Sequence, residues 1–216
     1  MPKDRVVLEI IGEGRTEFGD DPEVGPPEKG VLPILVHKLC GKPPQMLVKR
    51  RSFAVLEGKG LAKKVQFAKR QARQNQSDGA VFVLDTEGNM KERVEAMTEG
   101  RDREQPDYPM AIGVAHPCIE AWLLADPTAI RRGLNLSNTP TIPDEPENLP
   151  APCKNHRHNP KTVLAALGES RQKEISTESK DNIAKSMSNM TLVRERCPRG
   201  FAPFADEVET HIRPLF

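Results

Sequence analysis

The stretch GAVFVLDTEGN, residues 79–89, decides the fold of this chain. A glycine is followed by five apolar residues, and the run ends abruptly at Asp85, with Glu87 two positions later. A short continuous apolar run of this composition is typical of a strand buried on both faces of a parallel sheet. We therefore predict a central strand over residues 79–85 whose carboxyl end presents acidic side chains.

Similar signals extend outward on both sides of this strand. Apolar runs predict strands over residues 5–11 and 109–115, and residues 45–56 predict either one strand or an irregular strand pair. Helical spacing or helix-start signals mark residues 31–40, 60–74, 90–97 and 118–126, with Pro117 expected in the first turn of the last helix. Alternating strands and helices predict an α/β fold built on a parallel sheet.

The character of the chain changes beyond Asp126. Residues 133–160 contain six prolines and little periodicity, and the remainder predicts short helices. We expect an α/β core over residues 1–132, a proline-rich connecting loop over 133–160 and a C-terminal helical extension over 161–216 that packs on the core.

The composition narrows the class of protein. With 37% hydrophobic and 29% charged residues, the 216-residue chain fits a globular protein, and no segment approaches the ~20 apolar residues of a membrane span. The four cysteines form no CxxC pair, so we expect reduced thiols, a cytoplasmic location and no membrane contact. Cys153, His156 and His158 fit no standard zinc motif and favour a polar loop.

The net charge of +1 hides an asymmetry along the chain. Residues 9–28 hold seven acids and one arginine, whereas residues 42–73 hold ten Lys or Arg and one acid. The basic stretch 49–73 is either a contact for a nucleic-acid backbone or simply a solvated face.

Acidic residues follow each of the three clearest strands. Glu13 follows the first, Asp85 and Glu87 the second, and His116 and then Glu120 the third. Ligands of open parallel sheets bind outside the carboxyl ends of the strands, and carboxylates gathered there need a compensating cation. Oxygen ligands suit Mg²⁺ or Mn²⁺, so the pattern indicates a metal-dependent phosphoryl-transfer site. Taken singly, each acid also fits a helix cap, a turn or a surface position.

Three segments resemble the motifs of Toprim domains. IGEGRTE (residues 11–17) is similar to the first, glutamate-bearing motif, and VFVLDTEGN (residues 81–89) to the second, Asp-x-Asp motif. HPCIEAWLLAD (residues 116–126) resembles the third acidic segment of Toprim-like proteins in prokaryotic defence systems of the OLD and RloB types. The C-terminal NPK, SKDNIAKSM and CPRGF resemble the tail of small Toprim-like bacterial proteins described beside ATPases.

The resemblance implies a Rossmann-like sheet and Mg²⁺- or Mn²⁺-dependent cleavage of DNA or RNA, in antiphage defence. It makes Glu13 a metal ligand or general acid–base, Asp85 the main metal ligand and Glu120 the third acid. Glu87 stands where the family usually has its second aspartate. On these assignments, Glu120→Gln is expected to reduce cleavage without reducing thermal stability.

Further residues are candidates for lining the site or contacting phosphate: Glu17, His116, Lys161 and Lys180. The departure at Glu87 keeps a non-catalytic alternative open, in which the chain is a Toprim-like sensor or the regulatory subunit of a partner ATPase. FVLDTEGN also resembles the nucleophile strand of haloacid-dehalogenase-like phosphatases, but that motif normally lies on the first strand.

Overall fold

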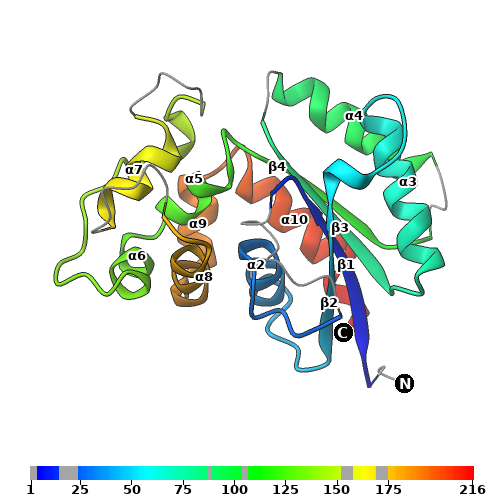
Figure 1. Ribbon diagram of the computed structural model, residues 1–216, viewed down its shortest axis with the longest axis horizontal. Helices are drawn as coiled ribbons and strands as arrows, with labels where there is room; N and C mark the ends of the chain where they lie inside the picture. Colours follow the sequence, from blue (N-terminus) through cyan, green and yellow to red (C-terminus); the bar gives the residue numbers. More distant parts are fainter. Residues whose placement is uncertain (1–3, 15–23, 87–88, 104–106, 152–157, 169–174) are drawn as a thin grey trace.

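The computed structural model describes residues 4–14, 24–86, 89–103, 107–151, 158–168 and 175–216. It confirms the predicted α/β fold, a parallel sheet flanked by helices (Figure 1). The strands are β1 (Val6–Gly12), β2 (Met46–Ser52), β3 (Gly79–Asp85) and β4 (Met110–Ala115), in the order β2-β1-β3-β4. Strands β1 and β3 are therefore central, and every neighbouring pair in the sheet is parallel.

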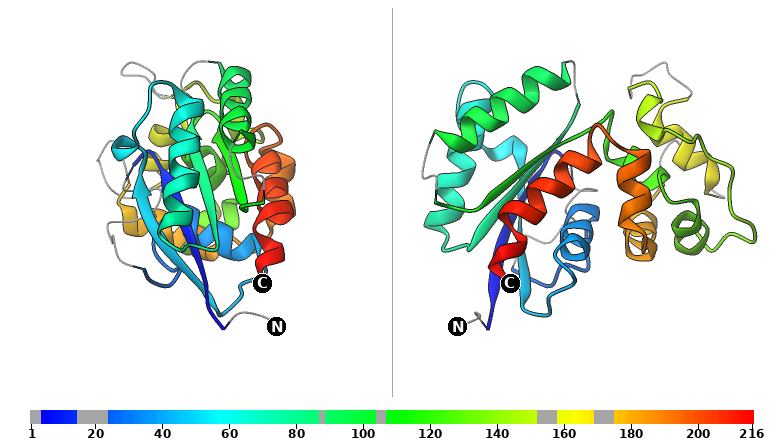
Figure 2. Two further views of the ribbon diagram at one scale, coloured as in Figure 1. Left: turned by 90° about the vertical axis from the view of Figure 1, so that its right-hand side faces the viewer. Right: turned by 180° about the vertical axis from the view of Figure 1, so that it is seen from behind.

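Helices cover both faces of the sheet (Figure 2). Helices α2 (Val31–Leu39) and α10 (Phe201–His211) lie on one face, and α3 (Leu61–Gln74) and α4 (Met90–Asp102) lie on the other. Val81 and Val83 of β3 pack into the core on the α2 side, whereas Phe82 and Leu84 pack into the core on the α3 side. Burial on both faces explains why this strand is continuously apolar.

The other helices form a group beside the carboxyl ends of the strands (Figure 1). They are α5 (Ile119–Leu124), α6 (Pro127–Gly133), α7 (Pro160–Leu167), α8 (Thr177–Ser186) and α9 (Met190–Arg196). Short 3-10 turns are η1 (Phe53–Val55), η2 (Pro146–Asn148) and η3 (Arg213–Leu215). Helix α6 packs closely on α8, and the absence of a side chain at Gly133 permits this approach. A Cβ at that position would lie only 2.5 Å from the Ile183 nitrogen.

An aromatic cluster joins this group to the sheet. Trp122 of α5 stacks on Phe204 of α10 with ring centroids 5.2 Å apart, and Phe201 meets the indole edge-on at 5.4 Å. Phe204 in turn lies against β4 at Gly113, where a Cβ would approach its ring to 2.6 Å. Large buried aromatic surfaces of this kind dominate packing energy, so α5 is firmly held relative to β4.

The structure resolves or corrects several predictions about individual segments. The ambiguous segment 45–56 is strand β2 followed by η1, and its Ser52 side chain accepts a hydrogen bond from the Ala54 amide. Pro117 lies before the N-cap Cys118 and not in the first turn of α5, so that prediction was wrong. Asp126 caps α6 by accepting a 2.9 Å hydrogen bond from the Ala129 amide.

The helices before and after the proline-rich segment share one hydrophobic core. Residues of α5 and α6 pack there with residues of α7, α8 and α9, and α10 runs back along β4. Among the helices of the described ranges, none has both the length and the apolar composition needed to cross a membrane.

Candidate metal site at the carboxyl edge of the sheet

The order of the strands places a topological switch point between the ends of β1 and β3, the position at which open α/β sheets have their ligand crevice. The chain leaves β1 through α2 on one face and enters β3 through α3 on the opposite face. In open α/β sheets, ligands bind at such a switch point, outside the carboxyl ends of the strands. Glu13 follows β1 directly, and Asp85 ends β3, so both acids border this crevice.

Three potential metal-ligating groups meet beside it. One ligand atom each from Asp85, Cys118 and Glu120 lies within 4.8 Å of the other two. Asp85 ends β3, Cys118 is the N-cap of α5 and Glu120 lies in the first turn of α5. The Ile119 amide donates a 3.0 Å hydrogen bond to Asp85 Oδ1, which fixes the start of the helix against the end of the strand.

Glu120 is a deeply buried carboxylate, with only 1% of its surface exposed. Lys180 of α8, itself 2% exposed, donates to Glu120 Oε1 at 2.7 Å. Burial opposes ionisation of Glu120, but the charges of Lys180 and Lys161 outweigh it and hold its pKa below the ordinary value. A hydrogen bond from the Cys118 thiol also lowers the pKa of Glu120, whereas the buried Oε2 receives no hydrogen bond from a nitrogen or oxygen donor of the described residues.

The pKa of Asp85 is shifted in the opposite direction to that of Glu120. Burial, the charge of Glu120 and the charge of Glu13 together raise the pKa of Asp85 to about 7, although Lys161 and the Ile119 amide favour its ionised form. Burial and the same neighbouring carboxylates, Glu120 and Asp85, raise the pKa of the Cys118 thiol. A cation beside these groups would therefore relieve a repulsion already present in the protein.

Glu13 reaches the edge of this group without joining the three ligand atoms. Arg93 of α4 approaches Glu13 Oε1 at 3.3 Å, and the same Nη1 donates to the Asp85 carbonyl at 2.8 Å. Arg93 thus ties the ends of β1 and β3 together. The role of Glu13 as a metal ligand stays a prediction.

Of the other candidate residues, some lie near the three-residue group and others lie outside the described part of the chain. Glu17 and Glu87 lie outside the described residues. His116 Nδ1 lies 3.3 Å from Thr86 Oγ1, and that hydroxyl donates to the Ala115 carbonyl, so the ring contacts the ends of β3 and β4. Burial, aided by the charge of Arg199, lowers the pKa of His116. Lys161, in the first turn of α7, acts electrostatically on both Asp85 and Glu120.

Sequence reasoning missed two members of the site. Cys118 was considered only as a reduced thiol, although it stands two residues before Glu120 and directly after a strand end. Arg93 was counted only as part of a helix. The signal for Cys118 was available in the sequence HPCIE, because all groups at the carboxyl ends of parallel strands converge on one edge.

A shallow depression adjoins the crevice on the α3 side. It has a cavity volume of about 380 Å³ and is lined by residues that include Phe53, Lys64, Asn89 and Arg93. Lys64 lies over the Phe53 ring, with Nζ 4.2 Å from the centroid. The lining thus carries two basic residues, Lys64 and Arg93, and one acid, Glu92, and Arg93 also contacts the acidic group.

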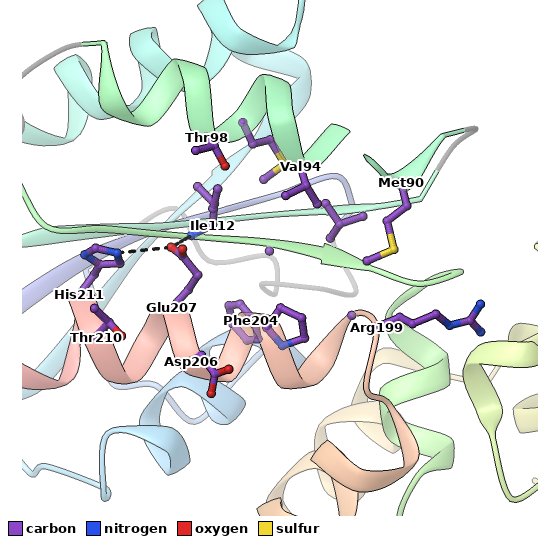
Figure 3. Close-up of a pocket in the computed structure, with 15 residues that line it drawn as sticks. Met90, Val94, Thr98, Ile112, Arg199, Phe204, Asp206, Glu207, Thr210 and His211 are labelled. Carbon is purple, nitrogen blue, oxygen red and sulfur yellow. Dashed lines mark hydrogen bonds and ion pairs between the residues drawn. The ribbon is translucent and has the colours of Figure 1, made fainter. Parts of the chain in front are cut away.

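A second cavity of about 380 Å³ lies along the edge strand β4, between α4 and α10 (Figure 3). Its apolar wall includes Val94 and Phe204. Glu207 is held there by two contacts of 2.6 and 2.7 Å from Arg101 and accepts a 3.3 Å hydrogen bond from the Ile112 amide. This carboxylate covers part of the strand edge, and no group of three potential metal ligands occurs there within the described ranges.

Comparison with known families gives one result. A family model for a domain of unknown function, DUF4276, matches residues 25–209. The chain belongs to the DUF4276 family. The matched region contains Asp85, Cys118, Glu120, Lys161 and Lys180, whereas Glu13 precedes it. No curated protein and no solved structure matches the chain.

Proposed function

We propose that this DUF4276 protein is a divalent-metal-dependent nuclease of the Toprim type, which hydrolyses phosphodiester bonds of DNA or RNA in antiphage defence. The carrying observation is the meeting of Asp85 and Glu120 at the carboxyl edge, where one buried Glu120 oxygen receives no hydrogen bond from a nitrogen or oxygen donor of the described residues. Buried polar atoms in folded proteins are nearly always hydrogen-bonded, so an exception at a sheet crevice favours a missing ligand.

The acidic residues fit a divalent cation. Asp85 and Glu120 would hold Mg²⁺ or Mn²⁺ through carboxylate oxygens, with Glu13, Glu17 and Glu87 as further proposed members of the site. Such an ion, when bound, activates water and offsets the charge that develops on a phosphoryl group.

The chain's own cations prepare the same edge for a phosphate. Arg93 holds the two strand ends in place through its contacts with Glu13 and the Asp85 carbonyl. Lys161 and Lys180 supply positive charge beside Asp85 and Glu120. His116 contacts Thr86 and so supports the position of the β3 end.

Only part of the basic stretch 49–73 is available for a nucleic-acid backbone. Arg50 donates to the carbonyls of Pro26 and Lys29, Arg51 binds the buried Glu9, and Lys69 donates to the Arg101 carbonyl. Exposed basic residues along this stretch are Lys59, Lys63, Arg70 and Arg73. We assign Lys59, Lys63 and Arg73, together with Lys64 in the depression, to phosphate contact that weakens as salt rises.

The proposed setting is the cytoplasm. Cys40, Cys118 and Cys197 are free and buried, as is usual where thiols remain reduced.

The test compares purified wild type with Asp85→Asn, using labelled single-stranded DNA, double-stranded DNA and RNA, each with Mg²⁺ or Mn²⁺. Asp126→Asn is the matched control, because asparagine serves equally well as an N-cap and Asp126 lies outside the group of Asp85, Cys118 and Glu120. We expect cleavage by wild type and Asp126→Asn, and none by Asp85→Asn. Absence of both cleavage and metal-induced thermal stabilisation in the wild type would refute the proposal.

Glu120→Gln is a poor test of catalysis, contrary to the expectation from sequence. Its neutral amide would leave the buried Lys180 ammonium without an opposite charge, so loss of stability would accompany any loss of activity.

The Glu120–Lys180 pair also favours the second candidate, a non-catalytic sensor or regulatory subunit of a partner ATPase. The ammonium already neutralises one of the acids, so the site can be stable without turnover. Metal-induced stabilisation without cleavage of any nucleic acid would support this alternative over the nuclease.

A further inference from the structure

We infer that Cys118 is itself a metal ligand, and that the site prefers Zn²⁺ and, less strongly, Mn²⁺ over Mg²⁺. The inference rests on the proposed metal site but does not depend on cleavage of nucleic acid. It adds a sulfur ligand to the carboxylates named above and changes the preferred cation from Mg²⁺ or Mn²⁺ to Zn²⁺.

The distances suit one ion. Metal–sulfur bonds in zinc sites are about 2.3 Å and metal–oxygen bonds about 2.0–2.2 Å, so two ligands of one ion lie within about 4.5 Å of each other. The Asp85, Cys118 and Glu120 atoms already lie within 4.8 Å of one another. Side-chain adjustments of a few tenths of an ångström would bring all three to bonding distance of a common point.

The surroundings of Cys118 differ from those of the other described cysteines. Cys197 packs in the core and donates to the Ala121 carbonyl at 3.6 Å, and Cys40 is buried in the same core. Cys118 is also fully buried, but it faces two carboxylates. Its thiol interacts with Glu120 through a hydrogen bond, so it is a polar member of this group and not only a small hydrophobic side chain.

An independent observation comes from Glu120. Lys180 donates to Oε1, and the buried Oε2 receives no hydrogen bond from a nitrogen or oxygen donor in the described part of the chain. The Cys118 thiol also acts on this carboxylate through a hydrogen bond, which places the sulfur beside Glu120. The Glu120 side chain is almost completely buried, so solvent does not satisfy this oxygen. Because Glu120 belongs to the same three-residue group, a cation bound there would supply the missing partner.

The charges also balance. Lys180 neutralises Glu120, and Asp85 with a Cys118 thiolate would provide the two negative charges that a divalent cation offsets. Thiolate is the metal-binding form of cysteine, and it favours zinc-like ions, whereas Mg²⁺ takes oxygen ligands almost exclusively.

The experiment titrates the full-length, metal-free protein with Cd²⁺, Zn²⁺, Mn²⁺ or Mg²⁺. Cd²⁺ serves as a spectroscopic probe, because cadmium–thiolate bonds give an ultraviolet charge-transfer band. Cys118→Ser is compared with Cys40→Ser, which removes another buried thiol outside the site. We expect the band in wild type and Cys40→Ser but not in Cys118→Ser, and at least tenfold weaker Zn²⁺ binding by Cys118→Ser.

A second measurement needs no variant. X-ray absorption by zinc-loaded wild-type protein should show a sulfur neighbour at about 2.3 Å. A zinc shell of oxygen and nitrogen only, or a cadmium band that survives in Cys118→Ser, would overturn the inference.

The outcomes separate this inference from the nuclease proposal. Equal Mg²⁺ binding by wild type and Cys118→Ser, with Mg²⁺-supported cleavage by both, would reject the thiol ligand and keep the nuclease. Sulfur coordination without cleavage would keep the ligand and reject the nuclease. Failure of every ion to bind would reject both.

Discussion

Two buried glutamates in this protein have opposite surroundings. Glu147, 2% exposed, accepts 2.7 Å hydrogen bonds on both carboxylate oxygens, from the amides of Arg199 and Gly200 at the start of α10. Glu120, 1% exposed, meets a lysine on one oxygen and receives no hydrogen bond on the other from a nitrogen or oxygen donor within the described residues. Glu147 thus holds the backbone at the start of α10 in place, whereas Glu120 belongs to the candidate metal site.

Their electrostatics differ in the same way. Burial raises the pKa of Glu147 despite its amide donors and the charge of Arg199, whose half-exposed side chain places Nε 3.8 Å from Oε2. The pKa of Glu120 is lowered although its burial is comparable, because Lys180 and Lys161 carry full positive charges. Burial alone therefore does not distinguish the two glutamates. They differ in the groups that bond to the carboxylate and in whether both of its oxygens are bonded.

The largest effect on stability is expected for Lys180→Ala, which removes the ion-pair partner of Glu120. Removal of one partner of a buried ion pair typically lowers the free energy of unfolding by about 3–5 kcal/mol, because the other charge remains buried. Urea unfolding at neutral pH measures the loss, and exposed Lys185→Ala in the same helix is the control. A loss like that of the control would mean that Glu120 does not depend on Lys180.

The second-largest effect on stability is expected for Glu147, the glutamate that accepts hydrogen bonds from backbone amides. Glu147→Ala leaves two amides at the start of α10 without their acceptor, so we expect a loss of about 2–3 kcal/mol in unfolding free energy. Glu145→Ala, on an exposed neighbour, should change stability by less than about 0.5 kcal/mol. The Glu147→Ala variant should also keep the wild-type increase in melting temperature with Zn²⁺. Loss of that increase would link Glu147 to the metal site.

A smaller effect of opposite sign is expected for Asp85→Asn. Asparagine can still accept the Ile119 hydrogen bond, and it removes a charge that burial and two neighbouring acids disfavour. We expect the metal-free variant to gain on the order of 1 kcal/mol in stability and to lose metal binding, a usual exchange at functional sites. Denaturant unfolding and calorimetric titration measure the two effects. Destabilisation together with retained metal affinity would contradict this role.

The last prediction concerns the dependence of stability on pH. The folded-state pKa of Asp85 is raised to about 7, above its unfolded value, so the folded state binds more protons in between. Its contribution should therefore lower the stability of the metal-free protein as pH rises from about 4 to 7, and become constant above that range. The difference in melting temperature between wild type and Asp85→Asn isolates the effect. A difference that does not grow over this range would count against the raised pKa.

Much of this architecture could be predicted from local pattern. The strands over residues 5–11, 79–85 and 109–115 were evident because burial on both faces requires continuous apolar runs. Convergence of Asp85 and Glu120 followed from the geometry of parallel strands. The proposed Toprim relationship and the identity of the metal stay predictions.

The remaining features depend on contacts between distant residues. Lys180 was only a candidate for phosphate contact, because nothing in its local sequence indicates that α8 places it against Glu120. The structural roles of Arg50 and Lys69 were likewise hidden within a basic stretch, where each looks like its exposed neighbours. Side-chain pairing across 60 positions cannot be obtained from periodicity.

The position of α8 also bears on how the protein matures during synthesis. Lys180 binds Glu120 of α5, and its neighbour Asp181 accepts a 3.0 Å hydrogen bond from Gly30 at the start of α2. On the ribosome, Glu120 emerges 60 residues before Lys180. The acidic edge therefore acquires its neutralising ammonium only after α8 has been synthesised, and a nascent chain that stops in the proline-rich segment lacks this part of the site.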